Sequence, residues 1–180
     1  MKVIEVIKSA CDFIGLEDIK TAIEEEIITD QDQKVIDKLL KCFNLVQEEI
    51  ATEFLPLSFK ESITATERIN FISLQKNILK VLSVKKGKEN LSFKVYPDHV
   101  CFKGNATEIT YNYLPEEVEI NDDILYLVPI RIYSYGIARE YFLFEGLADK
   151  AILFENRFRK SIETLIKKDD NIVMPVRKWF

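Results

Sequence analysis

The chain has 180 residues, of which 47% are apolar and 31% are charged, and its formal net charge is −5 at pH 7. This size and apolar content suit a soluble globular protein with one core, so we expect a single domain over residues 1–180 that carries an insertion. No apolar run approaches the roughly 20 residues of a membrane-spanning helix, and the negative charge argues against a protein that coats nucleic acid.

The first 56 residues are predicted to be helical. A first apolar stripe ends at Gly15, and a weaker one follows over residues 18–28. The strongest pattern begins at Asp30, a candidate helix cap, and stops before Pro56. Its apolar positions are Ile36, Leu39, Leu40, Phe43, Val46, Ile50 and Phe54.

The middle of the chain, about residues 69–120, is predicted to form a β-sheet. β-branched and aromatic residues become frequent there, and turn-forming residues interrupt them at short intervals. The expected strands form an antiparallel β-meander that rests on the helical part, and the stretch from Leu57 to Arg68 before them is expected to be a loop. The four predicted strands are residues 78–85, 91–96, 100–103 and 108–114.

Residues 127–168 are predicted to form a helical hairpin with its turn at Glu145-Gly146. Gly136 lies inside the first helix, where glycine costs about 1 kcal/mol relative to alanine, so we expect another helix to pack closely there. That helix is either the second one of the hairpin or the one that contains Cys42. The predicted inward positions are Ile130, Tyr133, Ile137, Tyr141, Phe144, Ala151, Phe154, Phe158, Ile162 and Leu165.

The fold class is therefore α+β: N-terminal helices, a central antiparallel β-meander, a C-terminal helical hairpin and an extended tail over residues 169–180. The tail ends in apolar and aromatic side chains, which either fold back onto their own subunit or dock into a partner. The candidate docking residues are Ile172, Val173, Met174, Pro175, Val176, Arg177, Lys178, Trp179 and Phe180.

The sequence contains no recognisable catalytic arrangement. His99, the only histidine, follows a Pro-Asp turn and is expected to be exposed, and Glu140 with Glu145 are expected to be surface charges of the hairpin beside Arg139. The five glycines are too dispersed for a phosphate-binding loop, and no acidic run has the calcium-loop pattern. We therefore expect no enzymatic activity, no cofactor and no metal site.

Three cysteines are isolated in the sequence and lack the spacing of a metal site. Cys11 and Cys42 occupy apolar positions of predicted helices. We expect all three, Cys101 included, to be buried free thiols of a protein in a reducing cytosol.

The charges are unevenly distributed along the chain. Acidic residues outnumber basic ones from Glu17 to Glu53, and basic residues outnumber acidic ones from Arg157 to Lys178. These are either two solvated faces or surfaces through which copies of the chain meet, acidic against basic. The candidate subunit-contact residues are Arg157, Arg159 and Lys160.

Three passages carry a resemblance to a known family. A long helix leads into a Leu-Pro loop in VIDKLLKCFNLVQEEIATEFLPL, and the strands end in a Tyr-x-Tyr-x-Pro motif at Tyr111, Tyr113 and Pro115 before an acidic segment. The third passage is the hairpin, SYGIAREYFLFEGLADKAILFENRFRKSIETL. In this order and spacing, the chain resembles the head-to-tail connector proteins of tailed bacteriophages and prophages, which are also called adaptor, head-completion or neck proteins.

The resemblance implies a non-enzymatic virion structural protein. Such a chain forms a ring, commonly of twelve copies, with the portal protein on one side and tail or stopper proteins on the other. It would reside in the neck of the virion after assembly in the host cytoplasm, and its C-terminal tail would dock into the portal.

DNA would pass through the ring during genome ejection and touch its wall transiently and without sequence preference. An acidic lumen would keep the DNA from sticking. Either the acid-rich region from Glu17 to Glu53 or a later acidic loop could provide it, and the candidate channel-facing residues of that loop are Glu116, Glu117, Asp122 and Asp123. An alternative reading of the chain is a bacterial protein-protein binding adaptor or regulatory partner, such as a toxin-antitoxin component, without enzymatic activity.

Overall fold

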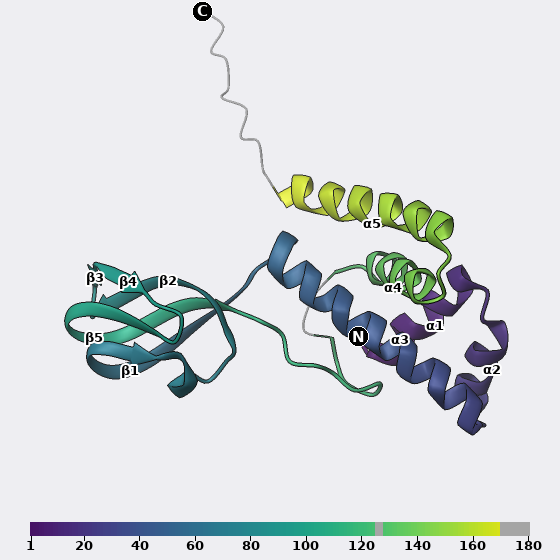
Figure 1. The fold of residues 1–180 in the computed structure, drawn as a ribbon, viewed down its shortest axis with the longest axis horizontal. Helices are drawn as coiled ribbons and strands as arrows, with labels where there is room; N and C mark the ends of the chain where they lie inside the picture. The colour runs from purple at the N-terminus through teal and green to yellow at the C-terminus, as the bar shows by residue number, and fades with distance from the viewer. Residues whose placement is uncertain (125–127, 170–180) are drawn as a thin grey trace, which may run out of the picture. The chain divides into compact units, whose positions relative to one another are not determined.

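The computed structural model describes residues 1–124 and 128–169, which combine helices with one antiparallel sheet (Figure 1). These residues divide into two compact units. The helical unit consists of the described parts of Met1–Val46 and Glu119–Phe180, and the sheet unit is Gln47–Val118. The elements in chain order are α1 Val3–Ile14, α2 Glu17–Glu25, α3 Asp30–Glu49, η1 Ile50–Phe54, β1 Leu57–Asn70, η2 Phe71–Ser73, β2 Ile78–Lys86, β3 Glu89–Leu91, β4 Phe93–Val95, β5 His99–Tyr113, α4 Ile130–Phe144 and α5 Ala148–Asp169.

Backbone carbonyl groups of a segment distant in the sequence accept hydrogen bonds from the first amides of α1. Lys2 at its N-cap provides no side-chain hydrogen bond. Instead, the free amides of Val3 and Ile4 donate to the carbonyl oxygens of Asp122 (3.0 Å) and Ile120 (3.0 Å). The other end closes at Gly15, as predicted, with a left-handed φ of 86° that glycine adopts without strain.

The cap of α3 lies one residue earlier than predicted. Thr29, and not Asp30, precedes the helix, and its hydroxyl accepts a hydrogen bond from the amide of Asp32 (3.2 Å). The Asp32 carboxylate accepts in return from the Thr29 amide (3.0 Å), which is a reciprocal capping arrangement. The Thr29 hydroxyl also donates to Oδ2 of Asp32 (2.7 Å), and this bond, followed by the one from the Thr29 amide, keeps the pKa of Asp32 below its ordinary value. α3 then continues to Glu49 and passes into the wider turn of η1 before Pro56.

The hairpin of α4 and α5 forms over the predicted residues, with its turn at Glu145-Gly146. The inward stripe of α5 is confirmed through Ile162, since Ala151, Phe154, Phe158 and Ile162 are all at most 6% exposed. The single inward stripe predicted for α4 is confirmed at Tyr133 and Ile137, which are fully buried, but it does not describe the whole helix. Residues 132–139 are all buried, because α4 is the central helix of its unit, whereas Phe144 is 55% exposed.

At Gly136, α4 packs closely against both α3 and α5. A Cβ atom there would lie 2.6 Å from Cγ1 of Val46 on α3 and 3.3 Å from Cε2 of Phe158 on α5. Both alternatives from the sequence are thus correct, because the second hairpin helix and the helix that contains Cys42 both pack against this glycine.

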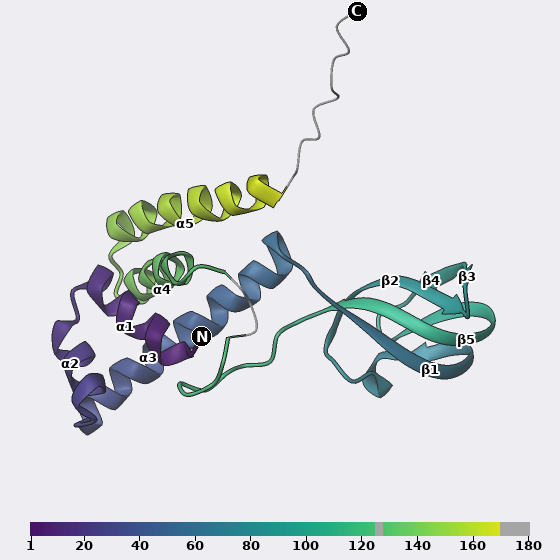
Figure 2. The same cartoon turned by 180° about the vertical axis from the view of Figure 1, so that it is seen from behind.

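The sheet is antiparallel but is not the predicted meander. Its order is β1-β5-β2-β3, and β4 also pairs with β5 (Figure 2). β5 is therefore the central strand, and β3 and β4, although consecutive in the chain, do not pair with each other. The predicted strands 100–103 and 108–114 form one continuous strand, β5. The expected loop from Leu57 to Arg68 is also wrong, because these residues belong to β1, which pairs with β5 from Leu57↔Tyr113 to Asn70↔His99.

The sheet unit has its own core, which contains one buried carboxylate. Residues from β1, β2 and β5 form this core, and Tyr111 is completely buried in it. The Tyr111 hydroxyl donates to Oε2 of Glu61 (2.7 Å), which also accepts from the Gln75 amide (3.2 Å). Burial and then the bond to Glu61 raise the pKa of Tyr111 to about 12.

Candidate protein-binding surfaces

The three predicted contact residues on α5 are all exposed, but they differ in what they touch. The Arg157 guanidinium lies 5.3 Å from the ring centre of Phe154 and 5.9 Å from that of Tyr135. Arg159 donates to Glu155 one turn earlier on the helix. Lys160 makes no ion pair within the described residues and lines a shallow groove of about 390 Å³ beside Arg131. Lys160 is therefore the contact residue whose charge is most available to a partner.

The residue behind this basic surface is Arg139, which the sequence analysis placed on the outer face of the hairpin. That placement is wrong. Arg139 is only 9% exposed, and its guanidinium donates to Glu140 (2.9 Å) and Glu155 (2.7 Å) and lies 5.1 Å from the ring centre of Phe158. Residues 132–139 of α4 are all buried, so a charge among them must be paired to be stable.

Glu155 accepts hydrogen bonds both from the buried Arg139 and from the exposed Arg159. Partial burial alone would raise its pKa, but hydrogen bonds from Arg139 and Arg159, and their charges, outweigh burial and leave the pKa below its ordinary value of 4.5. Glu140 and Glu145 do not form an acid-base pair here. Glu140 is bound to Arg139, and Glu145 pairs with Lys38 of α3 at 2.5 Å.

An exposed apolar patch covers the tip of the hairpin. We call it the hairpin-tip patch, and its members are Leu143 (53% exposed), Phe144 (55%), Leu147 (44%), Ile152 (60%) and Leu153 (49%). Sequence reasoning missed it because it placed Phe144 on the inward stripe and assigned no position to the other four members. Ile152 and Leu153 directly follow the buried Ala151, so they cannot share its face, and this offset is visible in the sequence.

A second exposed surface of opposite charge lies at the turn between α2 and α3. All residues from 24 to 30 are exposed, and this acidic turn contains Glu24, Glu25, Glu26 and Asp30. Two isoleucines lie among them, Ile27 at 67% and Ile28 at 43% exposure. In both views of the chain, α2 and α5 lie on opposite sides of the helical unit (Figures 1 and 2).

The four candidate channel residues divide between the two units. Glu116 pairs with Lys76 at 2.8 Å within the sheet unit, and the neighbouring Glu117 is exposed. Asp122 and Asp123 belong to the helical unit. The Asp122 carboxylate accepts from the Glu119 amide (2.7 Å), and Asp123 lies 3.5 Å from the N-terminal ammonium. A common acidic wall made by all four stays a prediction.

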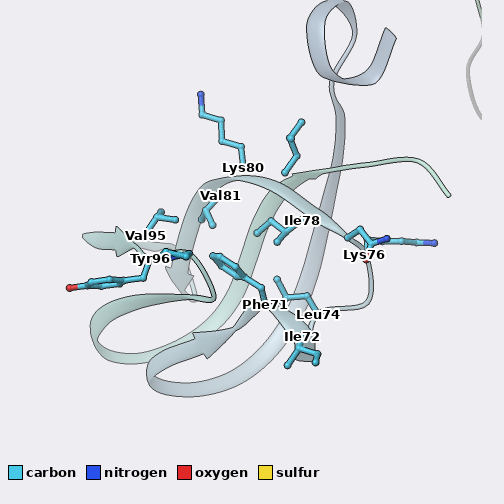
Figure 3. Close-up of a pocket in the computed structure, with 12 residues that line it drawn as sticks. Phe71, Ile72, Leu74, Lys76, Ile78, Lys80, Val81, Val95 and Tyr96 are labelled. Carbon is cyan, nitrogen blue, oxygen red and sulfur yellow. The ribbon is translucent and has the colours of Figure 1, made fainter. Parts of the chain in front are cut away.

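The sheet unit carries an open groove of about 570 Å³ (Figure 3). Three short segments line it: η2 with the residues that follow it, the first half of β2, and the turn between β4 and β5. Phe71 lies between Tyr96 and Ile78 in this view. The Phe71 amide donates to the carbonyl of Asp98 (2.9 Å), which fixes η2 against the turn. The sequence analysis did not identify this groove.

His99 lies beside the groove. It was predicted to be exposed, and this prediction is wrong. Its side chain is 16% exposed, because the ring stacks on that of Tyr96 with centres 4.7 Å apart. Nδ1 lies 2.6 Å from the Asp98 carboxylate, and this hydrogen bond keeps the pKa of Asp98 below its ordinary value. The imidazole thus has a structural position in the turn.

The cysteine prediction is confirmed for Cys11 and Cys42, which are buried, whereas Cys101 is only partly buried. Burial is the main reason why the pKa of Cys11 is raised to about 11 and that of Cys42 to about 12. No group of three or more His, Cys, Asp or Glu side chains suited to a metal ion occurs within residues 1–124 and 128–169. In the same ranges, no helix has both the length and the apolar character to cross a membrane.

The predicted docking residues Ile172 to Phe180 lie outside the described residues. Neither the models of known protein families nor the curated proteins include a match to this chain.

Proposed function

We propose that the chain is a structural, non-enzymatic subunit of the connector between head and tail in a tailed bacteriophage or prophage. Copies associate head to tail into a ring, with the portal protein on one side and tail or stopper proteins on the other. The particle neck is its final location, and assembly takes place in the host cytoplasm. DNA passes through the ring.

The observation that carries this proposal is the pair of unlike surfaces on the helical unit. The acidic turn exposes Ile27 and Ile28 among carboxylates, and the hairpin-tip patch exposes five apolar side chains, of which Ile152 and Leu153 lie on the helix that carries Lys160. Each surface combines apolar area to bury with charge to select a partner. A contact between two different surfaces of identical chains is heterologous, and such contacts close into rings when the rotation permits.

The opposite charges of the two surfaces also favour head-to-tail contacts between copies over symmetric contacts. Two acidic turns repel each other, and so do two basic surfaces, so the symmetric pairings are disfavoured. The opposite pairing places Lys160 of one copy in the field of Glu25 and its neighbours in the next. This attraction is screened at high salt, where the Debye length falls to about 3 Å at 1 M.

A charge-swap series tests this arrangement. Lys160→Glu alone and Glu25→Lys alone should each weaken self-association several-fold, measured by sedimentation velocity at low salt. The double variant carries both changes in each chain, so opposite charges again meet across every contact and part of the association should return. Lys86→Glu changes an exposed lysine of the sheet unit and serves as the matched control.

Three results would contradict the proposal: a chain that stays monomeric both alone and with the portal protein, Lys160→Glu indistinguishable from Lys86→Glu, or a double variant that associates more weakly than both single ones. A monomer that does not bind the portal protein would favour the alternative function, a bacterial protein-protein binding adaptor. The proposed docking of Ile172 to Phe180 into the portal is tested separately, by removing those residues from the full chain.

A further inference from the structure

The first half of β2 has an unpaired edge. On one side β2 pairs with β5 from Ile78 to Lys85, but on the other side β3 reaches only Val84 to Lys86. Residues 78–83 therefore have no strand partner on that side. At about 3.3 Å per residue, this free edge is roughly 20 Å long, enough for a five- or six-residue strand.

The unburied apolar side chains of the sheet unit gather at this edge. Among its residues, the large apolar side chains that are exposed are Ile72 (97%), Leu79 (43%), Leu82 (43%), Val95 (51%) and Tyr96 (38%). Four of them line the groove and Leu82 lies on β2 itself. A free strand edge beside exposed apolar side chains is what an added strand needs, because the edge supplies backbone hydrogen bonds and the groove receives alternate side chains.

The charge of the groove indicates the chemistry of the partner. Its only charged lining residues are Lys76 and Lys80. Glu116 already neutralises Lys76, whereas Lys80 has no ion pair within the described residues. Lys94 adds a third cation at the rim, with its ammonium 5.3 Å from the ring centre of Tyr96. An acidic side chain on the incoming segment would therefore be attracted, and a basic one repelled.

We propose that this groove binds an extended peptide segment of a protein partner, which adds to the sheet as a strand along residues 78–83 of β2. Its alternate apolar side chains lie in the groove, and an acidic residue faces Lys80. A peptide backbone fits this edge, because it alone presents donors and acceptors at the spacing of a strand. The proposal uses the sheet unit only and does not depend on ring formation by the helical unit.

The probe is a displayed library of random ten-residue peptides, selected on the full chain and counter-selected on Ile72→Asp. Ile72 is 97% exposed, so the substitution should leave the fold intact, which circular dichroism can check. We expect selected peptides to alternate apolar with polar residues and to contain at least one Asp or Glu. The best peptide is then synthesised and titrated into isotope-labelled protein.

The titration should shift the amide signals of residues 78–83 and of Val95 and Tyr96. Ile72→Asp should weaken binding at least tenfold and Lys80→Glu several-fold, whereas Leu143→Asp, which alters an exposed apolar side chain of the helical unit, should change nothing. The same peptide with proline at alternate positions should lose binding at least tenfold, because proline cannot donate to the ladder.

The proposal is overturned if selection yields no alternating consensus, if the shifted amides lie elsewhere, or if the proline peptide binds as well as its parent. It is also overturned if a basic peptide with the sequence of residues 170–180 binds more tightly than the selected acidic one. That result would make the chain's own C-terminal segment, supplied by a second copy, the occupant of the groove.

Discussion

Substituting Gly136 by alanine should destabilise the helical unit, although alanine is the better helix former. The new Cβ would lie 2.6 Å from Cγ1 and 2.8 Å from Cγ2 of Val46, well inside the 3.5–4.0 Å of a normal carbon contact. A β-branched side chain in a helix has one strongly preferred rotamer, so Val46 cannot turn away. Overpacking costs about 1–3 kcal/mol. Alanine recovers about 1 kcal/mol of helix propensity, which leaves a net loss of up to about 2 kcal/mol.

Urea unfolding followed by the helical circular dichroism signal measures this loss, and a double-mutant cycle locates its cause. Val46→Ala alone should cost about 2 kcal/mol through lost burial and a cavity. In Gly136→Ala/Val46→Ala the new methyl group occupies the vacated space, so the double variant should be about 1 kcal/mol more stable than the sum of the two losses. Asn156→Ala, at an exposed site of α5, controls for helix propensity. A stabilised Gly136→Ala, or strictly additive losses, would refute the close contact.

Three further predictions concern ionisable groups. Glu155→Gln should lower the free energy of unfolding by about 1–3 kcal/mol at pH 7. Because the pKa of Glu155 is lowered in the folded protein, the difference between wild type and variant should shrink as the pH falls below 4.5 and through the folded pKa. Tyr111→Phe should lower the free energy of unfolding by a similar amount, measured in urea. Because the pKa of Tyr111 is raised to about 12 in the folded protein, its contribution to stability should be complete below pH 10 and disappear as the pH rises through 12. With a disulfide reagent at pH 8, Cys11 and Cys42 should react only after unfolding in urea.

Each of these has a matched control and a contrary result. Glu163→Gln changes an exposed carboxylate 3.8 Å from Lys167 and should be nearly neutral. Tyr113→Phe removes a hydroxyl from the same strand as Tyr111 and should cost at most a few tenths of a kcal/mol. Equal losses for a variant and its control, a pH-independent effect of Glu155→Gln, or three rapidly reacting thiols in the folded protein would contradict the assigned environments.

The helices were predictable because packing side chains recur at helical intervals and because Gly15, Pro56 and Gly146 mark their ends. α4 shows where that reasoning fails. Its periodic pattern selects one face, but a helix that packs against α1, α3 and α5 buries polar and small residues as well, and sequence periodicity cannot reveal how many neighbours a helix has. The burial of Arg139 follows from this packing.

The sheet was less predictable because two local signals pointed the wrong way. β1 alternates regularly, but Glu61 occupies an inward position and its charge interrupts the apolar pattern. Its hydrogen bonds from Tyr111, fifty residues away, and from the Gln75 amide make that position stable. Gly104-Asn105 resembles a turn, yet β5 continues through it with Gly104 at a φ of 91°. The groove on this unit was beyond sequence reasoning, since it requires the pairing order of β2, β3 and β5.

The measurement that most directly tests the proposed function is the mass of the full chain in solution by light scattering, alone and mixed with the portal protein of the same genome. The proposal predicts a ring many times the 21.0 kDa of one chain, or a smaller species that joins the portal only when Ile172 to Phe180 are intact. A monomer or dimer whose mass is unaffected by the portal protein would contradict it.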